Sequence, residues 1–315
     1  MSHPSLQLSV IIPAHNPRPA SLGRVLAALA AQTLPPTHWE LVMVDNGSQP
    51  PLDPGAGRPG HPAGRVIRED RVGLTAARLS GLAASGGEIV VLVDDDNVLA
   101  PDYLEQTLGL FAAHPKVGAL GGKSQPEFAE TPPTWTKEFH PLLALRDLGP
   151  APLISRGLRP AGGARNGYPS FAPIGAGMAL RRAVATAWCG ARGREDAGIS
   201  DRRGSELTSG GDNDIVLCAM HAGWEVAYFP GLVLTHLIPA GRLDAAYLAR
   251  LNYGIQKSWM QVLSLHDANP WPSLPPASAA LRRWKAWFTH RAWSSPVARI
   301  RWRGACGHFD GRIPR

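Results

Sequence analysis

The chain has 315 residues, of which 44% are hydrophobic and 18% are charged, and this ordinary globular composition excludes global disorder. The net charge of +7 does not indicate a nucleic-acid partner, because residues 281–315 alone hold nine Lys or Arg and one acid, which leaves the rest near neutral. Three scattered cysteines, no signal-peptide pattern and no apolar run of about 20 residues predict a cytoplasmic protein without a spanning helix.

The first half of the chain alternates short apolar runs with helical patterns. Continuous apolar strands that alternate with helices predict an α/β fold, with a mostly parallel sheet covered by helices on both faces. Ligands of such sheets bind beyond the carboxyl ends of the strands. The predicted strands are Leu8–Pro13, Glu40–Val44, Arg65–Arg68 and Glu88–Val93, the predicted helices are Ser21–Ala31, Leu74–Ala84 and Pro101–His114, and Gln49–Gly64 is a predicted loop.

The pattern weakens after Gly121. Residues Lys123–Pro173 mix Pro, Gly, Trp and Arg without sustained periodicity, which predicts long loops over a site. Regular structure is expected again at Gly177–Val184, in a helix at Asp212–Ala222, in short strands at Glu225–Phe229 and Leu232–Leu237, and in a long helix at Arg242–His266.

Three adjacent carboxylates, Asp94, Asp95 and Asp96, directly follow an apolar strand. They repel one another unless a cation or solvent relieves them, and hard oxygen ligands suit Mg²⁺ or Mn²⁺. The alternative is a solvated acidic loop that caps the next helix.

Asp45 ends a neighbouring strand and is expected on the same edge of the sheet. Its carboxylate could accept a hydrogen bond from a nucleotide base or ribose, or it could serve only the turn Asp45-Asn46-Gly47-Ser48. Together with the acidic triplet, it favours a nucleotide pocket.

At this point the sequence resembles the family 2 glycosyltransferases of GT-A fold. The resemblance rests on five segments in the family's order, which together span most of residues 8–240. These segments are SVIIPAHN at Ser9–Asn16, VDNGS at Val44–Ser48, GLTAARLSGLAASGGEIVVLVDDD at Gly73–Asp96, GAGMALRR at Gly175–Arg182, and GGDNDIVLCAMHAGWEVAYFPGLVLTH at Gly210–His236.

The resemblance implies an enzyme that takes sugar from a nucleotide diphosphate sugar with the help of Mn²⁺ or Mg²⁺. By position, Asp96 and His236 match the metal site and Asp212 matches the general base. Most members carry Glu just before that base, where this chain has Gly211, so a supporting carboxylate is missing or is replaced by Asp214. The residues assigned to the nucleotide are Pro13, Asn16, Asp45, Arg78, Asp94 and Asp95, although Leu79 stands where the family usually has Asn.

The chemistry of sugar transfer agrees with these roles. One positioned carboxylate removes the proton of the attacking hydroxyl when direct displacement inverts the anomeric centre, and a divalent ion neutralises the leaving diphosphate. The alternatives are a helix N-cap for Asp212 and a buried, hydrogen-bonded histidine for His236.

Other α/β classes fit less well. The segment after the first strand, Pro13–Pro17, is neither the Gly-rich phosphate loop of a nucleotidyltransferase nor the GxGxxG of a dinucleotide enzyme. Gln256-Lys257-Ser258-Trp259 fails the QxxRW spacing of processive synthases, which predicts single-sugar transfer to a glycan or lipid-linked acceptor. The remaining alternative is a catalytically impaired binding or scaffold protein.

We predict a catalytic domain at 1–270, with a nucleotide-binding half at about 1–122 and an acceptor half at about 123–270, followed by a basic aromatic segment at 271–315. A helix at Leu281–His290 would place Trp284, Trp287 and Phe288 on one face, with basic residues around them. That composition predicts peripheral binding to an anionic membrane on the cytoplasmic side. The alternative is packing of the tryptophans on the catalytic domain.

Overall fold

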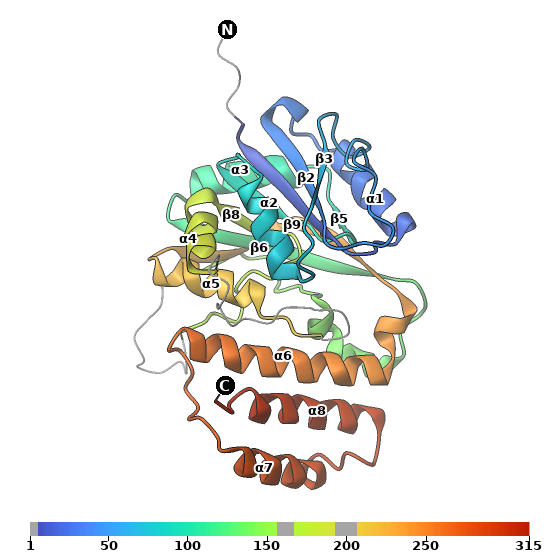
Figure 1. Cartoon of the computed structure of the whole chain (residues 1–315), viewed down its shortest axis with the longest axis vertical. Helices are drawn as coiled ribbons and strands as arrows, with labels where there is room; N and C mark the ends of the chain where they lie inside the picture. Colours follow the sequence, from blue (N-terminus) through green and yellow to red (C-terminus); the bar gives the residue numbers. More distant parts are fainter. Residues whose placement is uncertain (1–5, 156–166, 193–206, 315) are drawn as a thin grey trace.

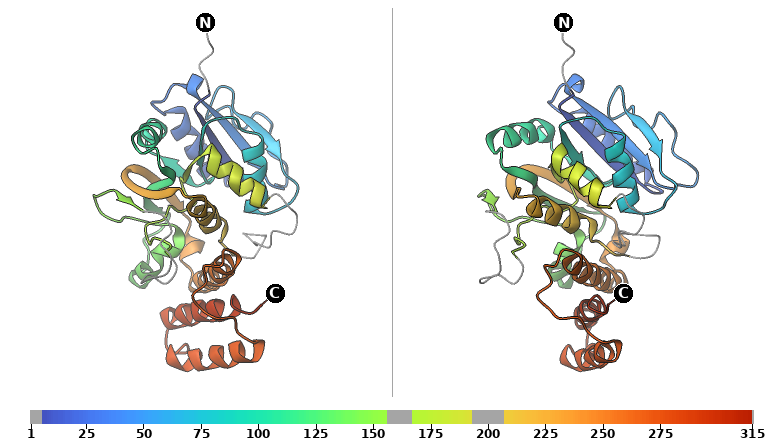
Figure 2. Two further views of the ribbon diagram at one scale, coloured as in Figure 1. Left: turned by 90° about the vertical axis from the view of Figure 1, so that its left-hand side faces the viewer. Right: turned by 60° about the vertical axis from the view of Figure 1, so that its left-hand side comes forward.

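The computed structural model describes residues 6–155, 167–192 and 207–314 (Figure 1). A twisted sheet lies at the centre with helices against both faces, and three further helices are stacked beneath it in the order α6, α8 and α7. Figure 2 shows the same stack at one end of the molecule from two other sides. None of the described helices is long and apolar enough to cross a membrane.

The sheet is mixed, with a parallel half and an antiparallel centre. Its order is β3-β2-β1-β4-β8-β6-β9-β5, and β7 also pairs with β9. Neighbours from β3 to β4 are parallel, β8 is antiparallel to both of its neighbours, and β6 and β9 are parallel. The strands are β1 (Leu8–Ala14), β2 (Trp39–Asp45), β3 (Arg65–Arg68), β4 (Ile89–Leu92), β5 (Asn97–Leu99), β6 (Val117–Phe128), β7 (Leu153–Ile154), β8 (Ala179–Arg181) and β9 (Glu225–Ile238).

Alternating side chains of β1 supply both halves of the core. Val10 and Ile12 pack with residues of α1 (Pro19–Ala30) and α3 (Tyr103–Ala113) on one face. Ile11 packs on the other face with residues of α2 (Leu74–Ala83), α4 (Arg182–Arg192) and α5 (Gly211–His221). Because side chains alternate across a strand, one apolar run fills two layers. This arrangement confirms the predicted α/β fold with helices on both faces of the sheet.

The last helices pack tightly on one another through glycines. Helix α6 (Ala245–Leu265) is followed by α7 (Pro276–Thr289) and α8 (Pro296–Asp310). A Cβ atom added to Gly307 of α8 would lie 2.1 Å from the carbonyl oxygen of Tyr253 in α6, so only glycine permits this approach. Ile300 of α8 is fully buried in the same cluster as Leu248 of α6. The basic C-terminal segment is therefore a helical hairpin held against α6.

Two segments differ from the sequence expectation. The expected loops of Lys123–Pro173 contain the second half of β6 and the 3-10 helix η2 (Thr134–Leu143), and the two short strands expected from Glu225 form one strand, β9. Residues 123–128 pair in parallel with 233–238, beyond a register shift at Gly121. A Cβ on Gly122 would lie 1.9 Å from the carbonyl oxygen of Leu232, so glycine allows the strands to stay paired through this irregularity. Two further 3-10 helices are η1 (Pro36–His38) and η3 (Ala240–Leu243).

Candidate active site

The loops after β1 and β2 join to form one corner of the site. The carboxylate of Asp45, at the end of β2, accepts hydrogen bonds from the backbone amides of Ser48 at 3.0 Å and Leu52 at 3.1 Å, and from Arg68 Nη1 at 2.6 Å. Burial raises the pKa of Asp45, but these donors outweigh it and the pKa lies below its usual range. Asp45 is thus ionised at neutral pH, and it fixes the turn as the local alternative predicted.

Asn16 connects the two loops. Its backbone amide donates to Ser48 Oγ at 3.0 Å, and its side-chain oxygen accepts from the amide of Gln49 at 2.8 Å. Asn16 is exposed and has a left-handed φ of 47°, which Asn tolerates better than most residues. Pro13 is buried in β1 opposite Val44 and presents no exposed surface to a ligand.

The acidic triplet lies one residue beyond β4. Asp94 and Asp95 are half-buried and Asp96 is buried. Burial and then the charges of Asp96 and Asp94 raise the pKa of Asp95, against the lowering effect of Arg242 and Arg18, to about 7. The repulsion expected from three adjacent carboxylates is therefore present, and it makes this edge of the sheet attractive to cations.

Asp96 and His236 are brought together by the pairing of β5 with β9, where Asn97 lies opposite His236. Asp96 Oδ1 is 3.3 Å from His236 Nε2, and both side chains are almost fully buried. Arg242, in η3, reaches the same point: its Nη2 is 3.0 Å from Asp96 Oδ2 and its Nη1 is 3.1 Å from His236 Nε2.

Asp96 and His236 offer two ligand atoms for a divalent ion. A carboxylate oxygen and an imidazole nitrogen 3.3 Å apart can ligate one ion, and both ligand types suit Mn²⁺. His236 Nδ1 is buried and has no hydrogen-bond partner among the described residues, whereas Nε2 faces Arg242, which can only donate a hydrogen bond. The donor set fits a metal, provided that the guanidinium of Arg242 leaves His236 Nε2.

Asp212 lies in the first turn of α5 and faces α2. Its Oδ1 accepts from Arg78 Nη1 at 2.9 Å, and its Oδ2 accepts from the backbone amide of Gly175 at 2.9 Å. Burial raises the pKa of Asp212, but the Arg78 guanidinium and the Gly175 amide hold it below its usual range. The N-cap of α5 is Gly210, so Asp212 does not cap the helix.

Arg78 is nearly fully buried in α2 and bridges to Asp212 across 134 residues of sequence. A Cβ on Gly175 would lie 2.5 Å from an Arg78 nitrogen and 2.9 Å from the Asp212 carboxylate, so glycine is required for this close arrangement. The structure therefore places Arg78 against the candidate base, whereas the sequence assigned it to the nucleotide.

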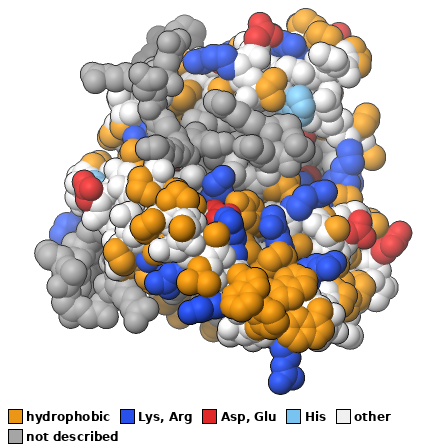
Figure 3. All heavy atoms as spheres, turned by 60° about the horizontal axis from the view of Figure 1, so that its bottom comes forward, with side chains coloured by type: hydrophobic (Ala, Val, Ile, Leu, Met, Phe, Trp, Pro, Cys, Tyr) orange, Lys and Arg blue, Asp and Glu red, His pale blue; other side chains and the backbone are white. Residues whose placement is uncertain are grey.

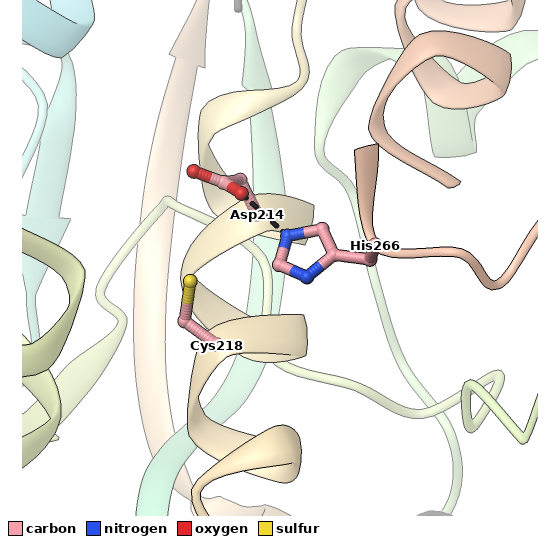
Figure 4. A group of neighbouring side chains, drawn as sticks. All are labelled: Asp214, Cys218 and His266. Atoms are coloured by element: carbon pink, nitrogen blue, oxygen red, sulfur yellow. Dashed lines mark hydrogen bonds and ion pairs between the residues drawn. The ribbon is translucent and has the colours of Figure 1, made fainter. Parts of the chain in front are cut away.

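Asp214 does not support Asp212. Its carboxylate turns towards α4 and the end of α6, where it accepts from Trp188 Nε1 at 2.6 Å, Arg192 at 2.6 and 2.7 Å, and contacts His266 Nε2 at 2.6 Å. Figure 4 shows Asp214, Cys218 and His266 together on α5 and after α6. Of the two alternatives left by Gly211, the missing carboxylate is the one that the geometry supports.

The Asp214 cluster does not fit a metal, although its three ligand-type side chains converge. Arg192 already neutralises the carboxylate, and burial together with the charge of Asp214 raises the pKa of the Cys218 thiol to about 12. Thiols bind metals as thiolates, so Cys218 is a poor ligand at neutral pH. The cluster instead joins α4, α5 and α6.

Removing the Asp214 carboxylate should strongly destabilise the fold. The change Asp214→Ala leaves Arg192, whose side chain is 11% exposed, buried without its partner, and the expected loss is about 3 to 5 kcal/mol of unfolding free energy. Urea denaturation measures this loss. The exposed pair partner Asp70 provides the control, since Asp70→Ala should cost less than about 1 kcal/mol. Equal effects of the two changes would contradict the structural role.

Several residues of the candidate site could not be identified from the sequence. Arg242 follows His236 by six residues in the same segment, and Arg68 ends β3 beside Asp45, but neither shows a signal beyond its charge. Gly175 was part of a recognised motif without an assigned role. Their functions depend on distances that only the folded chain defines.

The chain is an α/β protein with carboxylates gathered beyond the ends of the parallel strands β2 and β4. The sequence of residues 9–187, more than half of the chain, matches the family described as Glycosyl transferase family 2. The chain belongs to this family.

Two curated relatives have related names. The chain is 26% identical over 148 residues to a glucosyl-dolichyl phosphate glucuronosyltransferase of Haloferax volcanii, a match that covers 46% of this chain and 47% of that protein. It is 36% identical over 102 residues to the succinoglycan biosynthesis protein ExoW of Rhizobium meliloti, covering 31% of this chain and 32% of that protein. The chain thus spans less than half the length of these relatives.

A solved structure of residues 1–349 of S. aureus TarS is also similar. The alignment covers 97% of this chain and 90% of that chain, at 14% sequence identity and a TM-score of 0.48.

Proposed function

We propose that this chain is an inverting, metal-dependent glycosyltransferase that moves one sugar at a time from a nucleotide diphosphate sugar to a hydroxyl acceptor. Family membership supports sugar transfer. The observation that carries the finer proposal is the ionised Asp212 carboxylate, held between Arg78 and the amide of Gly175. Gly175 precedes β8, which pairs antiparallel with β4, and the acidic triplet follows β4.

Asp212 serves as the general base in this proposal. The acceptor hydroxyl loses its proton to the carboxylate as its oxygen bonds to the anomeric carbon, and the bond from that carbon to the diphosphate breaks with its electron pair going to the diphosphate. A single displacement of this kind inverts the centre and needs only one carboxylate. Arg78 positions Asp212 and keeps it ionised.

Asp96 and His236 would hold the divalent ion, Mn²⁺ or Mg²⁺, which supplies positive charge for the leaving diphosphate. The half-buried Asp94 and Asp95 lie next to this pair and would contact the ribose or diphosphate side of the donor. The charges of Arg242 and Arg18 both act on Asp95, and they would keep the acidic edge from repelling a diphosphate.

The nucleotide would lie against the corner built by Asp45 and Asn16. Both oxygens of the Asp45 carboxylate already accept hydrogen bonds from loop amides or Arg68. A nucleotide base would therefore contact an oxygen that also keeps one of these bonds. Pro13 contributes by shaping β1 at this corner.

We propose a glycan or a lipid-linked sugar as the acceptor. The names of the two relatives, one concerned with a dolichyl phosphate sugar and one with succinoglycan biosynthesis, support this class. The alternative of an impaired binding protein is favoured by Gly211 and by the orientation of Asp214, which leave Asp212 without a second carboxylate. Hydrolysis of nucleotide sugars by the purified protein with Mn²⁺ separates the two.

Thermal-shift screening of nucleotide diphosphate sugars, with and without Mn²⁺, tests the proposed donor class. Binding to the native state raises the melting temperature by mass action, and a ligand at a hundred times its Kd adds about 2.7 kcal/mol. We expect one nucleotide series to shift the melting temperature only when Mn²⁺ is present. An unchanged melting temperature with every donor, in protein shown to be folded, would contradict the proposal.

A further inference from the structure

The α7–α8 hairpin exposes an aromatic surface at one end of the molecule. Leu281, Trp284, Phe288 and Trp293 are 52%, 61%, 51% and 57% exposed. The ring centroids of Trp284 and Phe288 are 5.0 Å apart, and those of Phe288 and Trp293 are 5.8 Å apart, so the rings form one continuous strip. We call these four residues the aromatic strip. The other exposed large hydrophobics among the described residues are single and scattered: Val72, Leu148, Ile154 and Leu265.

The strip continues into an open groove of about 520 Å³. Beneath it, Trp287 packs edge-on against Trp302 of α8 with ring centroids 4.8 Å apart, and Trp302 Nε1 donates to the carbonyl of Arg283 at 3.1 Å. The two inner tryptophans therefore pack on each other within the hairpin, and not on the catalytic domain as the alternative stated, while the outer rings stay exposed. The groove is lined by Trp284, Trp287, Phe288, Trp302, Arg283 and Arg303, with Cys306 at its base.

Basic side chains surround the strip. Figure 3 shows a large hydrophobic patch bordered by Lys and Arg on the face that carries the lower end of the molecule in Figure 1. The single acid of the hairpin, Asp310, is already paired with Arg283 at 2.5 Å and accepts from Tyr253. Four exposed cations form no ion pair with any described residue: Arg282, Lys285, Arg291 and Arg299.

We infer that the α7–α8 hairpin docks on the surface of an anionic lipid bilayer. Exposed aromatic rings with a basic border are the composition of interfacial helices, in which rings enter the headgroup boundary and cations meet lipid phosphates. A second copy of this chain fits poorly, because two such faces would bring like charges together. The hairpin lies on the side of α6 that faces away from the sheet, so a docked bilayer leaves the candidate active site uncovered (Figures 1 and 2).

Flotation of the full-length protein with vesicles tests this inference without any donor or acceptor, so its failure would leave the proposed enzyme activity untouched. We expect the protein to float with vesicles of phosphatidylcholine mixed with phosphatidylglycerol at low salt, to float far less with phosphatidylcholine alone, and to be released at high salt. Truncation is avoided, because removing α8 would uncover Leu248 and Leu251 of α6, which are buried in one cluster with Ile300 of α8.

Point variants distinguish binding through the aromatic strip and its basic border from binding through the net charge of the whole protein. The pair Arg282→Gln and Lys285→Gln should lower binding to the anionic vesicles on the order of tenfold or more, and Trp284→Ser with Phe288→Ser should do the same. The matched control, Arg58→Gln with Lys116→Gln, removes the same charge from exposed residues of the sheet domain and should bind as the unchanged protein does. Absence of flotation, equal binding by all variants, or dimerisation through the strip in light scattering would each overturn the inference.

Discussion

Replacing Asp212 with Asn should lower the rate of sugar transfer on the order of 10² or more, while the affinity for the donor stays within a few fold. The amide keeps the shape and one acceptor oxygen for Arg78 or Gly175, but it cannot take a proton from the acceptor hydroxyl. Steady-state transfer rates and donor titration of the same preparation measure the two quantities. The exposed carboxylate Asp53 gives a matched control, and Asp53→Asn should leave both unchanged.

The loss of charge at Asp212 has a second effect that must be measured alongside. Arg78 is almost fully buried and its ion pair with Asp212 contributes to holding α2 against α5, so the variant should also melt at a lower temperature. Rates are therefore compared well below the melting transition. A near-normal transfer rate in folded Asp212→Asn protein would show that Asp212 only binds Arg78 and that another group is the general base.

The parallel half of the sheet could be read from the sequence because its strands are buried on both faces. Strand β4 is a continuous apolar run, and β1 and β2 are apolar except for Ser9, Glu40 and the terminal Asp45, in a chain region of alternating helices. The placement of Asp45 and Asp96 at one edge of the sheet follows from that topology alone. The hydrogen-bond partners of Asp45 and Asp96 do not follow from the topology.

The unpredicted features are pairings between distant segments. Arg78 and Asp212 are 134 residues apart, and the contact of Arg242 with Asp96 requires both the β5–β9 pair and the turn at η3. Likewise, the close packing of α8 on α6 depends on Gly304 and Gly307, which a helical periodicity analysis reads as weak helix formers. The local sequence pattern does not indicate which distant segment will pack closely against a glycine.

The ion pair at Asp96 changes how the metal assignment must be tested. Asp96→Ala would leave Arg242 without its carboxylate, and because Asp96 is buried, this substitution should cost stability as well as metal binding. Asp96→Asn keeps the side-chain shape and an oxygen for Arg242, and it removes only the charge.

In the Asp96→Asn variant we expect Mn²⁺ to lose its effect on donor binding, with the metal-dependent gain in affinity falling by about a hundredfold or more, since even indirect partners of metal ligands are worth about 10- to 100-fold. Thermal shift with a nucleotide diphosphate, with and without Mn²⁺, reads this out without requiring turnover. Arg242→Gln is the comparison, because it frees His236 Nε2 and should preserve or strengthen the Mn²⁺ effect. If instead donor binding is indifferent to Mn²⁺ in the unchanged protein and collapses in Arg242→Gln, the charge that meets the diphosphate is the guanidinium of Arg242, and Asp96 serves to hold it in place.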